Sequence, residues 1–431
     1  MIETGRPRVL LYAQGLVGVG HSVRIREIAR TLSVDFDVHL IDGGRSVTEA
    51  PLPPRAGITR LPPVYRDIRT SRLAAVDGEP ITAVLRRRQL ALDAAVCRFA
   101  ADVLVIEYFP FQRWELSDEI VGAIVRARRL NPKLLVCCSV RDVPRRPRTR
   151  GECEKIAAAL NEYFDYVLVH GDERITRLDE HFPDVASIKV PVVYTGYVAR
   201  KAPISPAPDP APGPSSGDVV VSAGGGIDAL ELMSTSAAAW RRLVARGDVG
   251  DRQMVFFLGP FTPRGDCRHL RELSAGGPFE VRPFSDDFLC RLRGTALSVS
   301  RAGYNTCTDI LGTSVPALLV PGTHVGDQVF RAQRFAERRL ADTIALGDLD
   351  ADRLAEALLE AMNTQRVRRD VALDGAEFTR AFLKRAMRPL ARLSGPAELA
   401  FHESIGRDRM TAAPKSARPA ASSWSSSPRP T

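Results

Sequence analysis

The sequence has no run of about 18 uncharged apolar residues, which a membrane-spanning helix needs, so no such helix is expected. Residues 9–20 are apolar, but glycines interrupt them and no small-residue cleavage site follows. This stretch predicts a strand and a loop rather than a signal peptide.

Cysteine pairs with metal-binding spacing are also missing. The seven cysteines are odd in number, and several fall in predicted strands or helices. Free thiols in a reducing cytoplasm fit this pattern, and no metal ligand is assigned. The cysteines stand at positions 97, 137, 138, 153, 267, 290 and 307.

Lysine is scarce, although the formal net charge is +9. Only six of the 60 basic residues are lysine, and the arginines are spread along the chain. No aromatic-interleaved basic stretch occurs, so a nucleic-acid partner is not expected. Three local clusters, at residues 86–88, 126–129 and 145–150, predict solvated faces; an anionic acceptor or peripheral contact with the inner face of the membrane is the alternative.

The composition is that of a large globular protein. Apolar residues make up 45% of the 431 positions and charged residues 26%, which predicts two or three domains. Strands and helices alternate in the first half, which implies a parallel, doubly wound sheet. The expected strands are Arg8–Ala13, Phe36–Ile41, Val103–Ile106, Leu134–Ser139, Tyr166–Val169 and Lys189–Val193, with a helix over Ser22–Leu32.

The same alternation restarts after a proline-rich stretch. We expect residues 1–200 to form one domain, 201–217 an exposed linker and 218–395 a second domain, with a disordered tail at 405–431. In the second half the expected strands are Val219–Ser222, Gln253–Leu258, Phe279–Arg282, Ala296–Val299 and Pro316–Val320, with helices over Leu230–Ala245 and Arg268–Leu273.

Residues 298–328 form the most informative stretch. A strand leads into Arg301-Ala302-Gly303, a helix begins at Tyr304-Asn305-Thr306, and a second strand ends at Pro321-Gly322. Ligands of open parallel sheets bind at this edge, where a helix N-terminus offers free N–H groups to an anion. The stretch therefore favours a phosphate-bearing ligand.

A second glycine-rich loop, Gly224-Gly225-Gly226, follows the first strand of the second half. It is either a plain tight turn or a loop kept free of side chains so that a diphosphate reaches backbone N–H groups. Asp309, one turn into the helix after Thr306, is either a solvated helix residue or a carboxylate that accepts the two hydroxyls of a ribose.

The first loop of the chain, from Gln14 to Ser22, carries Gly18, Gly20 and His21. It is a poor dinucleotide fingerprint because Val23 stands where a glycine or alanine is required, although Asp42 ends the second strand. The loop places His21 at the mouth of the expected cleft. There the imidazole can take a proton from an acceptor hydroxyl, or it only caps the helix or orients a phosphate.

These features together resemble the GT-B glycosyltransferases, specifically the family 28 group that contains the peptidoglycan N-acetylglucosaminyltransferase. The chain resembles still more the uncharacterised predicted glycosyltransferases related to that group. The likeness spans about residues 8–390 and is strongest over 280–335. The resemblance implies an α/β protein of the GT-B class, with two Rossmann-like doubly wound domains facing a cleft. It also implies a bacterial, cytoplasmic enzyme.

The resemblance implies a role for each matching residue. The acceptor is expected in the N-terminal domain, with His21 as the base or Glu107 as the alternative base, beside the segments 107–111 and 139–142. The nucleotide-sugar donor is expected in the C-terminal domain. Its implied contacts are Gly224, Gly225, Gly226, Asn305 and Thr306 for the diphosphate, Phe284 and Ser285 for the base, Asp309 for the ribose, Gln328 for the sugar, and Arg301 and Gly303 within the same motif.

Two departures from the family pattern bear on the donor. Aspartate replaces the usual glutamate at 309, and Val329 stands where a second glutamine is usual. The leading hypothesis is a glycosyltransferase, inverting and independent of metal, that uses a UDP- or dTDP-linked sugar as co-substrate and needs no cofactor. A nucleotide-sugar hydrolase, an epimerase on the same fold, and a noncatalytic nucleotide-sugar-binding module are the alternatives.

Overall fold

The structure is a computed structural model, and it describes residues 5–16, 20–44, 52–54, 56–67, 70, 72–201, 217–283, 288–322, 326–364, 370–387 and 410–411. Most of the expected linker and of the expected tail lies outside these residues. Within the described ranges no helix is long and apolar enough to cross a bilayer.

The N-terminal domain is built on one large sheet. Seven of its strands are parallel and follow the order β3-β2-β1-β6-β7-β8-β9, and β16 pairs antiparallel with β9 at the edge. These strands are β1 (Arg8–Ala13), β2 (Asp37–Asp42), β3 (Ala56–Arg60), β6 (Val103–Glu107), β7 (Leu135–Arg141), β8 (Tyr166–His170), β9 (Val192–Tyr194) and β16 (Met410–Thr411).

Helices cover both faces of this sheet, which is why its central strands are apolar at nearly every position. Along β1, Leu10 and Tyr12 pack towards one face, while Val9 and Leu11 pack towards the other. The first face is covered by α2 (Ile81–Phe99), α3 (Ser117–Leu130) and α4 (Arg150–Tyr163), and the second by α1 (Gly20–Leu32) and α11 (Gly375–Ala386). A small antiparallel hairpin, β4 (Val64–Arg66) and β5 (Leu73–Ala75), forms a separate two-stranded sheet.

The C-terminal domain repeats the plan with six parallel strands in the order β12-β11-β10-β13-β14-β15. They are β10 (Val219–Ser222), β11 (Met254–Phe257), β12 (Phe279–Arg282), β13 (Leu297–Ser300), β14 (Ala317–Leu319) and β15 (Asp342–Thr343). The helices are α5 (Ala229–Arg246), α6 (Arg264–Ser274), α7 (Phe288–Gly294), α8 (Tyr304–Thr313), α9 (Gly326–Glu337) and α10 (Ala351–Met362).

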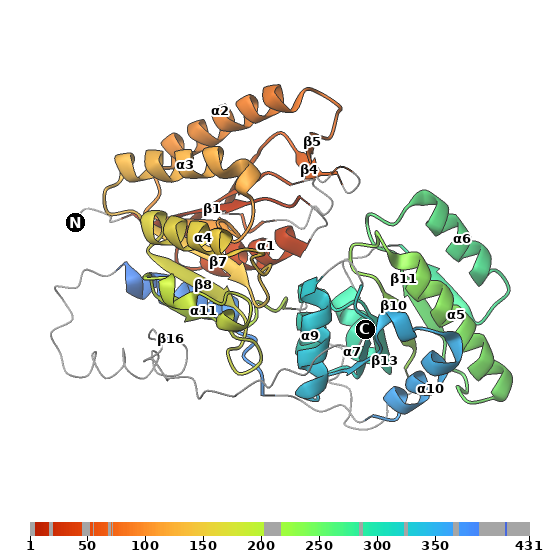
Figure 1. Cartoon of the computed structure of the whole chain (residues 1–431). Coiled ribbons are helices and arrows are strands. Elements are labelled where there is room, and N and C mark those ends of the chain that lie inside the picture. The colour runs from red at the N-terminus through yellow and green to blue at the C-terminus, as the bar shows by residue number, and fades with distance from the viewer. Residues whose placement is uncertain are drawn as a thin grey trace, which may run out of the picture.

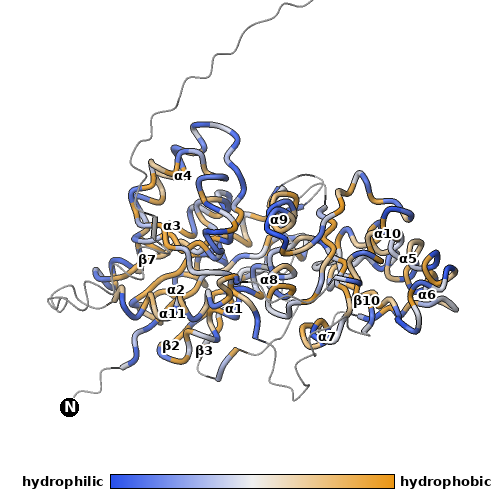
Figure 2. The backbone as a smooth tube through the Cα atoms, turned by 90° about the horizontal axis from the view of Figure 1, so that it is seen from below, coloured by the Kyte–Doolittle hydropathy of each residue, from blue (hydrophilic) through white to orange (hydrophobic). Residues whose placement is uncertain are grey.

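Two apolar layers enclose this second sheet. Val219 and Val221 of β10 pack with α5 and α10, while Val220 packs with α8 and α9. Hydrophobic and hydrophilic stretches accordingly alternate along the outer helices (Figure 2). Short 3₁₀ turns at Trp114–Leu116, Leu178–Glu180, Val185–Ser187 and Leu346–Asp348 complete the described elements.

The chain passes between the two domains twice, and the two passages touch each other. Tyr197 N–H donates to the Ala372 carbonyl at 2.7 Å, and Gly375 N–H donates to the Tyr197 carbonyl at 3.0 Å. After the second passage α11 packs against α1 of the N-terminal domain, although it falls within the expected C-terminal domain 218–395 (Figure 1). The N-terminal sheet is therefore completed by residues that follow the C-terminal domain in the sequence.

Candidate functional site

Both sheets place the predicted loops where ligands of doubly wound folds bind. The strand order reverses between β1 and β6 in the first sheet and between β10 and β13 in the second. At such a switch point the loops after the two strands diverge and leave room for a ligand at the carboxyl edge. His21 and Glu107 lie at the first switch point, and Gly224 and Gly303 at the second.

In the N-terminal domain the structure joins the two predicted candidates for the base. His21, in the first turn of α1, and Glu107, the last residue of β6, are both buried. His21 Nδ1 lies 3.0 Å from Glu107 Oε1, and Arg24, one turn further along α1, donates to the same oxygen at 2.5 Å. Because the carboxylate can only accept, the His21 proton resides on Nδ1 and the Nε2 lone pair points away.

The charge states of this pair follow from burial and from its neighbours. Burial lowers the pKa of His21 to about 4, although the Glu107 carboxylate opposes the shift. Burial alone would raise the pKa of Glu107, but His21 and Arg24 outweigh it and hold that pKa at about 2. At neutral pH the pair is therefore a neutral imidazole oriented by an ionised carboxylate.

Two residues that follow β6 surround the imidazole. The His21 ring meets the Tyr108 ring edge to face, with 5.3 Å between centroids. An Arg113 guanidinium N–H donates to His21 Nε2 at 3.2 Å. Tyr108 and Arg113 both adopt positive φ, 69° and 74°, on either side of the cis Phe109-Pro110 bond. No sequence pattern indicates Arg113, whereas its spacing of three residues from His21 could have indicated Arg24.

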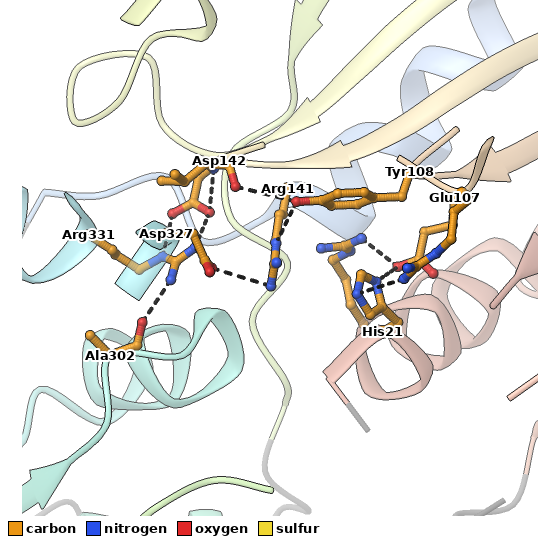
Figure 3. A network of polar contacts seen from close by, with 11 residues as sticks. His21, Glu107, Tyr108, Arg141, Asp142, Ala302, Asp327 and Arg331 are labelled. Atoms are coloured by element: carbon orange, nitrogen blue, oxygen red, sulfur yellow. Dashed lines mark hydrogen bonds and ion pairs between the residues drawn. The ribbon is translucent and has the colours of Figure 1, made fainter. Parts of the chain in front are cut away.

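A polar network leads from this pair into the C-terminal domain (Figure 3). Arg141 at the end of β7 donates to the Tyr108 hydroxyl at 3.0 Å and pairs with Asp327 of α9 at 3.5 Å. Its neighbour Asp142 accepts two hydrogen bonds of 2.8 Å from Arg331, and both side chains are fully buried. The segment 139–142, expected on the acceptor side, thus contacts α9 as well.

The glycines of the second domain have different neighbours. Gly226 has φ 87°, and a Cβ there would stand 2.8 Å from Gly259 Cα and would also strike the Thr262 hydroxyl. Gly224 has φ 59°, and a Cβ there would meet only the Thr306 hydroxyl, at 3.8 Å. Gly226 is therefore required for loop packing, while Gly224 faces the start of α8.

The N-terminus of α8 lies at the carboxyl edge of the second sheet. Gly303 is its extended N-cap residue, and the first intrahelical bond runs from Cys307 N–H to the Gly303 carbonyl at 2.9 Å. The N–H groups of Tyr304 and Thr306 precede that bond and have no intrahelical acceptor. Together with Gly224 they form an edge suited to an anion.

Arg301 and Gln328 both bond to the protein backbone. Arg301 is buried and donates to the carbonyls of Val320 and Asp228 at 3.2 and 3.0 Å, so it ties β14 and the start of α5 to the end of β13. The Gln328 side-chain carbonyl accepts from Gly322 N–H at 3.0 Å. Both residues hold the site's framework in this structure, and their direct contact with a donor stays a prediction.

Asp309 lies on the side of α8 that contacts the first passage between the domains. Its side chain is buried, and Arg200 on the first passage between domains contacts both carboxylate oxygens, with Nε 3.1 Å from Oδ1. Burial raises the pKa of Asp309, and Arg200 opposes this shift. A ribose would therefore have to share or displace this ion pair. Of the other predicted contacts, Phe284, Ser285 and Gly18 lie outside the described residues.

Two further features lie away from the switch points. The sequence contains Asp-x-Asp triplets at 35–37, 348–350 and 350–352; the first is at the amino end of β2, and Asp350 caps α10.

A cavity of about 790 Å³ opens beside the two passages between the domains, next to Lys201, Asp370 and Glu377. Among the described site residues, none lines this cavity. The described ranges also hold no group of three or more His, Cys, Asp or Glu side chains placed to bind a metal ion.

Two doubly wound domains, each with a switch point in its sheet, are the architecture of the GT-B fold. Solved glycosyltransferase structures match this architecture. The calicheamicin glycosyltransferase CalG4 matches with a TM-score of 0.52 and 14% identity, over 93% of this chain and 99% of that one. MurG of Acinetobacter baumannii matches with a TM-score of 0.53 and 15% identity, over 88% and 99%. TcCGT1 in complex with UDP gives 0.54 and 13%, over 94% and 100%.

The sequence comparisons specify the type of C-terminal domain. Residues 264–381 match the glycosyltransferase family 28 C-terminal domain. The protein is thus family 28-like, with the GT-B fold.

Curated relatives match the chain over a limited length. The UDP-N-acetylglucosamine–N-acetylmuramyl-(pentapeptide) pyrophosphoryl-undecaprenol N-acetylglucosamine transferase of Sinorhizobium fredii is 35% identical over 104 residues, which is 24% of this chain and 28% of that protein. Its counterpart in Brucella canis is 36% identical over 90 residues, 20% and 24% of the two chains. The chain therefore matches about a quarter of the length of these relatives.

Proposed function

We propose that this protein transfers a sugar from a nucleotide-sugar, UDP- or dTDP-linked, to a hydroxyl or amine of an acceptor. The observation that carries the proposal is the neutral His21 imidazole, oriented by buried Glu107 at one switch point, with an anion-binding edge at the other. The family 28 match over residues 264–381 supports a nucleotide-sugar at the second edge.

In the proposed reaction His21 Nε2 takes the proton of the acceptor hydroxyl. The hydroxyl oxygen forms a bond to the anomeric carbon of the donor, and the bond from that carbon to the diphosphate oxygen breaks. The departing diphosphate keeps the electron pair. The N–H groups at the start of α8 and the Gly224 loop stabilise the negative charge that develops there.

This arrangement favours inversion and does not require a metal. The base belongs to one domain and the diphosphate edge to the other. A sugar between them would therefore be attacked from the side opposite its leaving group, which inverts the anomeric configuration. The positive potential of a helix N-terminus can replace that of a cation at the diphosphate.

We further propose a cytoplasmic location with peripheral contact at the inner face of the membrane. Leu90 of α2 and Leu130 of α3 are 62% and 48% exposed, near the exposed Arg87 and Arg129. Such an apolar and basic surface suits anionic lipid headgroups. Not every basic residue of these clusters contributes, because Arg88 is fully buried and bonds to Glu119.

The test begins with binding and proceeds to turnover. A thermal-shift panel of UDP, dTDP and GDP on the full chain identifies the nucleotide, and release of that nucleoside diphosphate from its sugar conjugates is then followed with a pool of acceptors. Acceptor-dependent release that is lost in His21→Ala supports transfer. Release of free sugar without acceptor indicates a hydrolase, and nucleotide binding without any turnover indicates a binding module.

A further inference from the structure

Arg113 is a buried cation that has no carboxylate within ion-pair distance among the residues that the structure describes. Arg113 is only 5% exposed, and its Nε has no hydrogen-bond acceptor among the described residues. Within the described residues, the Arg113 guanidinium donates a hydrogen bond to His21 Nε2, which is a neutral acceptor. Burying a guanidinium without an opposite charge is costly, and burial accordingly lowers the pKa of Arg113.

The surroundings of Arg113 do not neutralise it. Arg24 pairs with Glu107, Arg331 with Asp142, and Arg141 shares Asp327 with Arg331. Glu115, two residues further along the chain, also attracts Arg113 but pairs with Arg66. Four carboxylates thus stand against five guanidiniums once Arg113 is included, so these residues carry a surplus of one positive charge beside His21.

Two of these cations lie within cation–π distance of the same aromatic ring. The guanidinium carbons of Arg113 and Arg141 lie 5.8 and 5.2 Å from the centroid of the Tyr108 ring. His21 meets the same ring from the side. Arg141 accordingly contributes to the lowered pKa of Arg113, and an anion bound near both guanidiniums would relieve this repulsion.

The Arg113 contact also occupies the one lone pair that His21 would use as a base. His21 Nδ1 carries the proton donated to Glu107, so only Nε2 can accept another. Arg113 donates to that nitrogen at 3.2 Å. A base engaged in this way accepts a substrate proton only after the guanidinium has moved.

We propose that Arg113 binds an anionic group of the acceptor, a carboxylate or a phosphate, and that this binding draws its guanidinium away from His21 Nε2. The released nitrogen then accepts the proton of the neighbouring acceptor hydroxyl. This assignment rests on the proposed function and gives it a substrate class, an acidic acceptor. A neutral acceptor would leave Arg113 on the base.

The anion is assigned to the acceptor because of where Arg113 stands. Arg113 follows β6 in the N-terminal domain and touches the proposed base. The diphosphate of the donor has its own edge at Gly224 and α8 in the other domain. An anionic group on the donor sugar is the competing source, and donor titrations distinguish it.

The experiment follows the imidazole nitrogens of ¹⁵N-histidine-labelled full-length protein by NMR at pH 7.5. The probes are glycerol 3-phosphate and glycerate, with glycerol as the uncharged control. We expect one or both anions to shift the His21 Nε2 resonance saturably towards that of a nitrogen without a donor, and glycerol to leave it unchanged. The anion with the lower apparent dissociation constant tells phosphate from carboxylate. If neither anion moves the resonance, the proposal fails.

Variants assign the effect to Arg113. In Arg113→Gln we expect the anion-dependent shift to weaken at least tenfold in apparent affinity, and in Arg113→Lys to weaken less. Arg353→Gln is the matched control, because Arg353 is exposed on α10, outside the basic clusters, and pairs with Asp348. An equal response in Arg113→Gln and the parent would overturn the assignment. Should Arg113→Gln not fold, the Lys variant and the parent still decide the result.

These measurements stand apart from turnover. An Nε2 shift in a protein that transfers no sugar would retain the anion subsite and reject the proposed function. Transfer to a neutral acceptor at full rate, with no Nε2 response to anions, would retain the function and reject the subsite. An Arg113→Gln defect in donor affinity alone would place the anion on the donor and also overturn the proposal.

Discussion

The imidazole of His21 has both nitrogens engaged, and its environment sets the pH at which it can work. A base must be unprotonated, so turnover should be lost as pH falls through the pKa of His21. Because burial brings that pKa to about 4, we expect turnover to stay level from pH 8 to about 5 and to halve near pH 4. An unperturbed histidine would instead give a midpoint near pH 6.5. Single-turnover rates across pH 3.5 to 8 make the comparison.

Stability must be followed in the same experiment. Unfolded His21, with a pKa near 6.5, binds a proton that the folded residue refuses until about pH 4, so the free energy of unfolding decreases as pH falls through this window. His21→Ala removes this dependence at position 21. It should also reduce turnover by about 10²–10⁴ with donor affinity unchanged. Reduced donor affinity would assign His21 to the diphosphate.

Asp309 offers a second test at the scale of one side chain. If its carboxylate accepts the ribose hydroxyls, Asp309→Ala should raise the dissociation constant of the nucleotide about tenfold to a hundredfold. Asp309→Glu, which restores the usual family residue, should bind much like the parent. Arg200 remains partly exposed and can be solvated in the Ala variant, so the fold should persist. Calorimetry with the nucleoside diphosphate measures the effect, and an unchanged affinity would leave Asp309 with a purely structural pairing.

The sequence indicates candidate residues for the site but not the partners that those residues contact. His21 and Glu107 were each assigned as alternative bases, yet the structure makes them one pair, because β1 and β6 are neighbours in the sheet. Arg200 and Arg113 contact predicted residues 109 and 92 positions away. Nothing local in the sequence encodes such contacts, since they depend on the finished topology.

Among the elements, the loop after β10 contains one glycine that packing requires, Gly226, and one that is proposed to contact the nucleotide, Gly224. Gly226→Ala forces a methyl group onto the Gly259 backbone at a positive φ, which should destabilise the protein by about 3 kcal/mol or more. Gly224→Ala has room and should cost about 1 kcal/mol, while its methyl group points at Thr306 and weakens nucleotide binding. Urea unfolding and nucleotide titration of both variants check this. Equal stabilities would contradict the assignment.

The central strands could be predicted almost residue by residue. Arg8–Ala13 and Val219–Ser222 have the expected bounds, because short apolar runs between turn residues leave little choice. The edge strand Phe279–Arg282 also has the expected bounds, although its sequence is not an apolar run. The last strand of the first half was misplaced: Lys189–Val193 was expected and Val192–Tyr194 is found. β3 has no buried residue, so the hydrophobic pattern could not indicate it.

For the molecule as a whole, the buried pair between Asp142 and Arg331 should matter more than other contacts between the domains. Asp142→Asn leaves the fully buried Arg331 with only the Asp327 carboxylate that it shares with Arg141, among the described residues, which should cost about 3 kcal/mol. Asp370→Asn breaks the interdomain contact with Arg174, but Asp370 is 93% exposed, and the change should stay within about 1 kcal/mol. Denaturant unfolding of both variants is the measurement. A comparable loss in the two would show that burial of the pair is irrelevant.

The return of α11 to the N-terminal domain has a consequence during synthesis. Residues emerge from the ribosome in order, so the N-terminal sheet is exposed long before Gly375–Ala386 exists. Until then Ile25, Ile28 and their neighbours on the α1 face lack the cover of Ala376 and Leu383. The first domain to be made is therefore the last to be finished, and its incomplete apolar face is open to self-association for as long as translation of the second domain takes.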